Sequence, residues 1–426
     1  MMPRHSHPST IAKIFPSTHS NQIEPPGPAS KMTDFASANP ARLRSLDQFR
    51  GYTMLGMLLV NYLGSFELCP RILRHTNNYC SYADTIMPQF LFAAGFAMRL
   101  SLGKRWKSDG RLPWVRVIRR ILGLAMIAIV WYSICDLGAI IQQFRTEEFF
   151  TVIGHLSKRS FFQTLMHIAA TSLWILPVIV ASARWRLFYA AVSGLIHIVL
   201  SWAFNFAWVW ASPAGIDGGP LGFLTWCVPA LVGTVASDWV QTHGVRAGAR
   251  ISGFGLGLVL FGWLLSSLTV LYDVPVDLRD SLKSQKLASD PVFPETSRWE
   301  RWNLQVAEPP FVPPPETNER KGNYWMMSQR AGSLSYTVFA AGVSLVVFAL
   351  FLWVCDSRGF QLGIFRTLGT NSLAAYLLHD IASWIVSPWF PSSSSAAMTF
   401  TGFVGFTALV YGGCRLLEAR KWYLRV

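Results

Sequence analysis

Apolar segments long enough to cross a lipid bilayer recur along the chain from residue 52 onwards. A spanning helix needs roughly 20 apolar residues. Segments near that length lie at residues 52–66, 82–102, 114–140, 161–183, 187–210, 221–240, 251–271, 333–354, 368–389 and 396–416. Residues 121–130 are apolar on every side, whereas the strands of a membrane barrel alternate. We therefore predict an all-α fold, a polytopic membrane helical bundle of about ten transmembrane helices.

Composition supports the membrane class and excludes two others. The chain is 51% hydrophobic and 14% charged, with a mean hydropathy of +0.32, which is too apolar for a water-soluble domain. Its 29 Phe, 18 Trp and 12 Tyr exclude a disordered chain. The net charge of +14 indicates cytoplasmic loops that face anionic membrane lipids, and we expect no nucleic-acid partner.

Lysine and arginine in alternate loops predict the orientation, because positive charge is retained on the cytoplasmic side. The basic loops on one side contain Lys104, Arg105, Lys107, Arg111, Arg116, Arg119, Arg120, Arg184, Arg186, Arg246, Arg250, Arg358 and Arg366, and the carboxyl end adds Arg415, Arg420, Lys421 and Arg425. The short loops on the other side carry fewer. We expect a multi-pass protein of the inner membrane with both termini in the cytoplasm.

Two regions differ in composition from the rest of the chain. Residues 1–41 are polar and rich in proline, which predicts a flexible cytoplasmic tail before a membrane domain of residues 42–426. Residues 272–330 are rich in Pro and Glu, which predicts an irregular extracytoplasmic insertion.

The six cysteines show no pair with the two- to four-residue spacing of a zinc site, so we predict no metal site. Cys69 and Cys80 both fall in the first predicted extracytoplasmic loop. In an oxidising compartment they can form a disulfide, and two free thiols are the alternative.

Residues 44–101 resemble the catalytic region of the heparan-alpha-glucosaminide N-acetyltransferase family in its bacterial-type form. The shared features are R-S-x-D-x-F-R-G at the start of the first helix, Val60-Asn61 within it, a histidine in the next loop, and Ala83-Asp84 before a Phe-rich helix with a proline. Residues 163–174 (QTLMHIAATSLW), 368–379 (LGTNSLAAYLLH) and the basic end 421–426 follow in the family's order. The family's asparagine-lysine-asparagine-x-tryptophan motif is not preserved before Ser335.

The resemblance implies a membrane acyltransferase that transfers acetyl from cytosolic acetyl-CoA to an amine or hydroxyl of an extracytoplasmic sugar or glycan. His75 corresponds to the family's essential histidine, and imidazole titrates near neutrality as a general base must. His75 could equally act as a transient acyl carrier, and the sequence does not separate the two roles. A solvated loop histidine is the alternative without chemistry. We interpret Asp84 as the residue that orients His75 or as a helix cap. Asn61 either polarises the thioester or hydrogen-bonds a neighbouring helix.

Further polar residues are candidates for binding. His379, Asp380 and Asn371 lie in the G-x-N-S-x-x-x-Y-x-x-H-like segment, and we predict that they bind substrate, with helix packing as the alternative for His379. The resemblance places coenzyme A at the cytoplasmic face. The candidates there are Arg50, Asp47, Arg119 and Arg120, for which an ion pair or lipid anchoring is the simpler role.

Two other functions remain open from the sequence. A transporter of a small solute or protons would use Asn61, His379 and Asp380 as a path without covalent chemistry. A structural membrane subunit would tolerate apolar replacement of the same residues. The sequence leaves the acceptor undetermined, and a homodimer remains possible.

Overall fold

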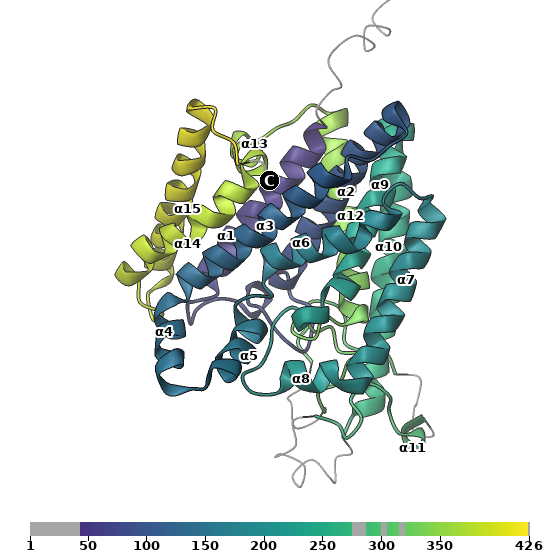
Figure 1. The fold of residues 1–426 in the computed structure, drawn as a ribbon, viewed down its shortest axis with the longest axis vertical. Coiled ribbons are helices and arrows are strands. Elements are labelled where there is room, and N and C mark those ends of the chain that lie inside the picture. Colours follow the sequence, from purple (N-terminus) through teal and green to yellow (C-terminus); the bar gives the residue numbers. More distant parts are fainter. Residues whose placement is uncertain (1–42, 275–286, 300–304, 315–319, 425–426) are drawn as a thin grey trace, which may run out of the picture. The chain divides into compact units, whose positions relative to one another are not determined.

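The computed structural model describes residues 43–274, 287–299, 305–314 and 320–424, and these fold into helices joined by turns (Figure 1). The α-helices are α1 (Arg44–Leu63), α2 (Ile86–Asp109), α3 (Trp114–Cys135), α4 (Leu137–Thr146), α5 (Phe149–Arg159), α6 (Thr164–Ile175), α7 (Ala183–Leu200), α8 (Phe206–Trp210), α9 (Phe223–His243), α10 (Ala247–Ser266), α11 (Thr296–Trp299), α12 (Leu334–Phe351), α13 (Gly363–Thr370), α14 (Ser372–Val386) and α15 (Ala396–Ala419). In this part of the chain β pairing is limited to two isolated bridges. The predicted all-α class is confirmed for these described residues. The predicted tail at residues 1–41 lies outside them.

The predicted count of about ten spanning helices is not confirmed. Helices occur in every predicted segment, but within the described residues only 6 stretches are long and apolar enough to cross a membrane. These are Ala83–Asp109, Trp114–Cys135, Ala183–Trp210, Gly219–Tyr272, Leu334–Ser357 and Ala396–Ala419. The 54 residues of Gly219–Tyr272 contain both α9 and α10, which are separated by a turn at Gly244. Helix α14 is short, and α1 carries Arg44, Asp47 and Arg50 in its first two turns.

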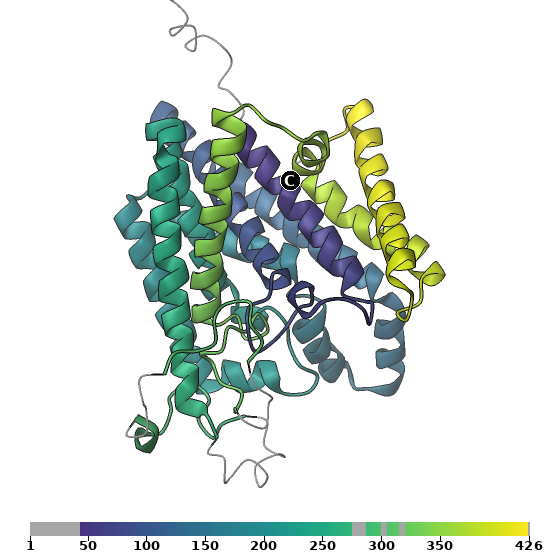
Figure 2. The same ribbon diagram turned by 180° about the vertical axis from the view of Figure 1, so that it is seen from behind.

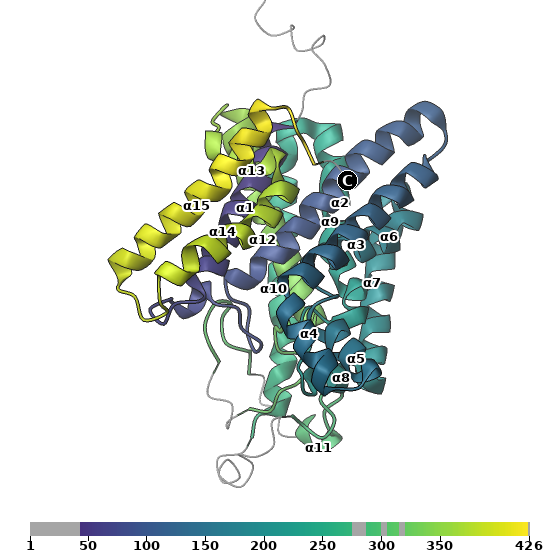
Figure 3. The same cartoon turned by 60° about the vertical axis from the view of Figure 1, so that its left-hand side comes forward.

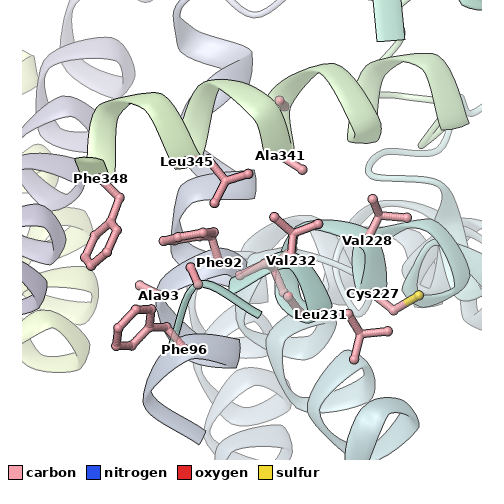
Figure 4. Close-up of a cluster of buried hydrophobic side chains, with 14 of the residues drawn as sticks. Phe92, Ala93, Phe96, Cys227, Val228, Leu231, Val232, Ala341, Leu345 and Phe348 are labelled. Carbon is pink, nitrogen blue, oxygen red and sulfur yellow. The ribbon is translucent and has the colours of Figure 1, made fainter. Parts of the chain in front are cut away.

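The largest core lies where α2, α9 and α12 pack together. Figure 4 shows Phe92 and Phe96 of α2 beside aliphatic side chains of α9 and Phe348 of α12. Two glycines let α2 and α9 approach closely. A Cβ on Gly95 would collide with the carbonyl of Ala230, and one on Gly233 with the carbonyl of Phe92. Small residues at such positions are typical of helix contacts in membranes, where close backbone packing replaces the hydrophobic drive available in water.

Other helix pairs flank this core. Helix α12 packs along α10, side by side in Figure 2. On another side, α13, α14 and α15 pack against α1 (Figure 3). The backbones of α1 and α13 are close enough that Gly369 faces the carbonyl of Asp47.

The predicted cytoplasmic loops gather at one end of the bundle. The Ser45 amide, at the start of α1, donates to Asp356 Oδ1 at 3.3 Å, and Gln48 donates to the carbonyl of Leu362 at 3.1 Å. The turn before α10 packs against residues 352–357. Helix α2 runs from the loop of His75 to this end and stops at Gly110, whose φ of 62° suits a left-handed glycine cap. The loop of His75 and the basic segment 104–120 are therefore at opposite ends.

A charged triad ties three helices together near the basic end. Asp238 of α9 accepts from Arg99 Nε of α2 at 2.7 Å and from Arg186 of α7. Arg186 is fully buried, and Arg99 also donates to the carbonyl of Ile179 at 2.7 Å. The single carboxylate balances two cations, so the three helices depend on it.

Removal of this carboxylate should destabilise the bundle strongly. Asp238→Ala leaves Arg186 buried without its counter-ion, and breaking a buried pair in this way costs about 3 to 5 kcal/mol. Denaturant unfolding of the detergent-purified protein measures the loss. Asp109→Ala is the matched control, because Asp109 is exposed and bonds only Ser108 locally. Equal stability of the two variants would contradict this role of the triad.

The described part of the 272–330 insertion is mostly irregular and packs on the bundle. Arg320 forms a bidentate pair with Glu308 at 2.8 and 2.7 Å and bonds Asp273 at 3.0 Å. Phe311 contacts Phe339 of α12, and Tyr324 is fully buried. This packing fixes the segment that leads into α12, and that segment contributes a side chain to the site described next.

Candidate functional site

The loop between α1 and α2 carries His75 and is held by its own hydrogen bonds. Arg74 donates to the carbonyls of Phe66 and Glu67 at 2.5 and 2.8 Å. The amide of Tyr82 donates to the carbonyl of Ile72 at 3.0 Å. These bonds fold the loop back on itself and fix the backbone on both sides of His75.

Asp84 lies at the centre of this loop, immediately before α2. Its side chain is fully buried, and its Oδ1 lies 2.9 Å from His75 Nδ1. The Ser81 amide donates to Oδ2 at 3.0 Å, and the Thr76 hydroxyl lies 3.1 Å from the same oxygen. Tyr336 of α12 donates to the backbone carbonyl of Asp84 at 2.5 Å. The predicted orienting role and a structural role in the loop thus coincide in one residue.

Two residues from distant parts of the chain complete the cluster. Gln329 Oε1 lies 3.1 Å from His75 Nδ1, and Gln329 Nε2 donates to Asp217 Oδ1 at 2.9 Å. Asp217 is 6% exposed and belongs to the turn between α8 and α9. We call His75, Asp84, Gln329 and Asp217 the histidine cluster.

The partners of Nδ1 determine the form of the imidazole. Asp84 Oδ1 and Gln329 Oε1 both accept hydrogen bonds, so Nδ1 carries the proton. In the neutral ring Nε2 then holds the lone pair. Within the described residues Nε2 has no hydrogen-bond partner, and the His75 side chain is 50% accessible. Nε2 can therefore accept a proton from a molecule that approaches His75 from the solvent-accessible side of the ring.

The charges around the ring set its titration. Burial lowers the pKa of His75, but the Asp84 hydrogen bond and charge, the Asp217 charge and the Gln329 hydrogen bond raise it, and the net pKa lies above 6.5. Because half of the His75 side chain is exposed to solvent, burial lowers its pKa only to a limited extent. Burial raises the pKa of Asp217 to about 6, against the lowering by the Gln329 hydrogen bond and the His75 charge. His75 is thus a stronger base than a free imidazole.

The structure has no disulfide between Cys69 and Cys80, which agrees with the second of the two alternatives that the sequence leaves open. Both are free thiols, and each sulfur lies 3.6 Å from a backbone carbonyl beside it, that of Pro70 or of Ser81. Cys80 is buried and Cys69 is partly exposed. Hydrogen bonds to Asp84 and Arg74 constrain the loop where the sequence suggested a covalent bond.

A second polar cluster joins α1, α3 and α14. Asn61 Nδ2 lies 3.3 Å from His379 Nε2, and His379 Nδ1 bonds the carbonyl of Tyr376. Nδ1 therefore donates, and Nε2 accepts from the amide of Asn61. Trp131 of α3 donates to Asp380 Oδ2 at 2.7 Å. The structure thus brings Asn61 together with His379, and the hydrogen bonds of the described residues do not join Asn61 to His75.

Asn371 is the N-cap residue of α14, whereas His379 lies in the middle of that helix. Its amide donates to the carbonyl of Thr367 at 3.0 Å and to Glu418 of α15 at 3.1 Å. Eight residues of helix separate the two side chains, a rise of about 12 Å. The structure therefore places Asn371 in the contacts among α13, α14 and α15 and apart from the other predicted substrate residues.

The four residues predicted to bind coenzyme A lie on two helices, two on α1 and two on α3. Arg50 of α1 donates to Ser372 Oγ of α14 at 2.5 Å, and Asp47 is one turn before it. Arg119 and Arg120 are exposed on α3, where Arg119 lines an open surface hollow with Trp114. The exposed basic and tryptophan side chains of α3 suit lipid headgroups, the simpler of the two roles weighed for them.

Sequence reasoning missed two members of the histidine cluster. Asp217 lies in the glycine-rich stretch 215–222, whose composition is typical of a tight turn. The aspartate before two glycines is a signal for a residue placed by that turn. Gln329 lies in an irregular segment where the sequence departs from the family pattern. Its position depends on how three loops fold together, so no local pattern marks it.

A scan against protein-family models finds none that matches the chain, and a search of curated proteins finds no significantly similar sequence. The resemblance noted in residues 44–101 therefore remains a prediction.

Proposed function

We propose that the chain is a membrane acyltransferase in which His75 is the general base. The observation that carries this proposal is the arrangement at Nδ1, where two oxygen acceptors hold the proton and leave the lone pair of Nε2 open. A buried carboxylate behind an accessible imidazole is the arrangement that activates nucleophiles in many acyl-transfer enzymes. The acetyl-CoA donor and the glycan acceptor follow from the sequence resemblance.

The proposed reaction uses His75 twice. Nε2 takes the proton of the acceptor amine or hydroxyl as its nitrogen or oxygen attacks the thioester carbonyl carbon. The carbon–sulfur bond then breaks, and the coenzyme A thiolate takes the proton back from the imidazolium. The Asp84 carboxylate stabilises the imidazolium during the reaction.

Transfer of radiolabelled acetyl from acetyl-CoA to a panel of amino sugars and cell-envelope glycans tests the proposal with purified protein. Product formation that depends on His75 supports it. Acetyl transfer to none of the acceptors, together with a failure to bind coenzyme A, would argue against it.

A transporter is the second candidate, and the cluster of Asn61, His379, Asp380 and Trp131 favours it. Polar and ionisable groups at membrane depth mark solute or proton paths. Flux of protons or a small solute through reconstituted protein, without acyl transfer, would support this alternative. Acyl transfer with no flux would assign these residues to the enzyme.

The acyltransferase requires His75 and the basic segment 104–120 on opposite faces of the membrane. We expect an impermeant thiol reagent to label Asn78→Cys in intact cells and to leave Ser108→Cys unlabelled, because loops with many cations stay in the cytoplasm. A background with Cys69→Ser and Cys135→Ser removes the two partly exposed native thiols. Labelling of both positions after permeabilisation is the control. Labelling of Ser108→Cys in intact cells would reverse the orientation.

A further inference from the structure

Three loops that are far apart in the sequence meet at the side chain of Gln329. His75 comes from the loop between α1 and α2, Asp217 from the turn between α8 and α9, and Gln329 from the segment before α12. A backbone bond from the Gly218 amide to the carbonyl of Arg330, at 2.9 Å, joins two of these loops beside the contact. The Gln329 side chain therefore links His75 to a part of the fold that is independent of Asp84.

Both anchor points of this link are fixed by the backbone. Asp217 has a left-handed φ of 52°, and its carbonyl accepts from Trp226 Nε1 at 2.8 Å. Aspartate tolerates this conformation, which residues adopt when the surrounding structure requires it. The Gly332 amide donates to the carbonyl of Gln329 at 2.9 Å, in a turn that leads directly into α12. The main chain is therefore held by hydrogen bonds at both Asp217 and Gln329.

The carboxylate of Asp217 determines which way the Gln329 amide points. An ionised carboxylate only accepts hydrogen bonds, so the NH₂ group faces Asp217 at 2.9 Å. The amide oxygen must then face His75, at 3.1 Å from Nδ1. The reverse orientation would set two oxygens against each other at Asp217 and two donors against each other at His75.

We infer that Gln329 is a positioning residue for His75 and that Asp217 acts on His75 through Gln329. The inference rests on the proposed acyl transfer. Asp84 and Gln329 accept from the same Nδ1 proton from two loops, which fixes the plane of the half-open ring as well as its tautomer. A ring held on both sides presents Nε2 to the acceptor in one orientation.

The charged groups that face His75 are Asp84 and Asp217. Tyr79 and Cys80 lie near Asp84, and burial, followed by the charge of Asp84, raises the pKa of each, so both stay neutral near pH 7. Arg330, next to Gln329, lies over the ring of Trp210 at 5.1 Å. When Gln329 is substituted, a change in the pKa of His75 therefore reflects the lost amide and the charges of Asp84 and Asp217.

Gln329→Leu should lower the turnover number about tenfold, the usual effect of one lost hydrogen bond, with little change in KM for the acyl donor. Asp217→Asn should lower it less, because an asparagine can still accept from the Gln329 amide. In the Gln329→Leu background, Asp217→Asn should cause no further loss, since its path to His75 is already broken. If the fold-losses in turnover number of the two single variants multiplied in the double variant, the inference would be overturned.

Chemical modification of His75 gives a measurement that does not need turnover. Diethyl pyrocarbonate reacts with neutral imidazole, so peptide mass spectrometry across pH yields the midpoint for His75. Gln329→Leu should lower this midpoint, because the hydrogen bond to Gln329 raises the pKa of His75. Gln329→Glu, which keeps an oxygen beside Nδ1, should hold the midpoint at or above the wild-type value. A purely structural role of Gln329 would move both variants alike.

Gln241→Leu is the matched control, because Gln241 is exposed and bonds only Ser237 on its own helix. It should leave the midpoint and the turnover unchanged. An unchanged midpoint in Gln329→Leu would refute the positioning role. If the wild-type protein transfers no acyl group while the midpoints shift as expected, the proposed function fails and the contact through Gln329 stands.

Discussion

His75→Ala should lower acetyl transfer by about 10²- to 10⁴-fold, the range for loss of a positioned acid or base. The alanine removes the lone pair at Nε2, so the acceptor must lose its proton to water. Affinity for coenzyme A should change much less, because the loop of His75 and the basic end of the bundle are at opposite ends. The assay compares initial rates of radiolabelled transfer by folded wild-type and variant protein.

His243→Ala is the control for this substitution. His243 is an exposed histidine at the end of α9, so its loss tests for a general effect of removing an imidazole. Its rate should equal that of the wild type. Undiminished transfer by His75→Ala would remove His75 from the mechanism and leave it as a solvated loop residue.

Asp84→Asn should lower transfer by a similar 10²- to 10⁴-fold, because an amide can donate to Nδ1 and favour the tautomer with the proton on Nε2. The pH profile supplies a second result. The proposed base is neutral His75, so transfer rises as pH increases through its pKa, which lies above 6.5. Loss of the Asp84 charge lowers that pKa, so the rate that remains should rise at a lower pH than in the wild type.

The same pair contributes to stability with a defined sign. Because folding raises the pKa of His75, its contribution to the free energy of unfolding is fully present below pH 6.5 and is lost as pH rises through the raised pKa. Asp84→Asn should flatten this dependence. Asp290→Asn is the control, since Asp290 accepts from the amides of Val292 and Phe293 and not from His75. An unaltered pH profile in Asp84→Asn would contradict the role of Asp84.

The all-α membrane class and two residues of the candidate site could be predicted from the sequence. Apolar runs without alternation require helices in a bilayer, because backbone groups there must bond within their own segment. His75 and Asp84 are nine residues apart in one loop, so a short turn is enough to bring them together. The family resemblance of residues 44–101 therefore pointed to this pair before any tertiary contact was known.

The number of spans was harder to predict from hydropathy, because α1 combines charged residues with an apolar length and α14 is too short to span by itself. Asn371 and His379 share a sequence motif, but Asn371 caps the start of α14 and His379 lies two turns further along it. The choice between a disulfide and two free thiols at Cys69 and Cys80 stayed open for a related reason. Spacing shows that two sulfurs can meet, whereas the fold of the loop decides whether they do.

Gln329 and Asp217 join the candidate site through tertiary contacts between distant loops. They are 112 residues apart from each other, and Gln329 is 254 residues from His75. Their meeting depends on how α2, α9 and α12 pack, which sets the positions of the three loops. The same packing makes Arg99, Arg186 and Asp238 one charged triad. Contacts of this kind arise from the summed packing of whole helices, and no window of sequence contains that information.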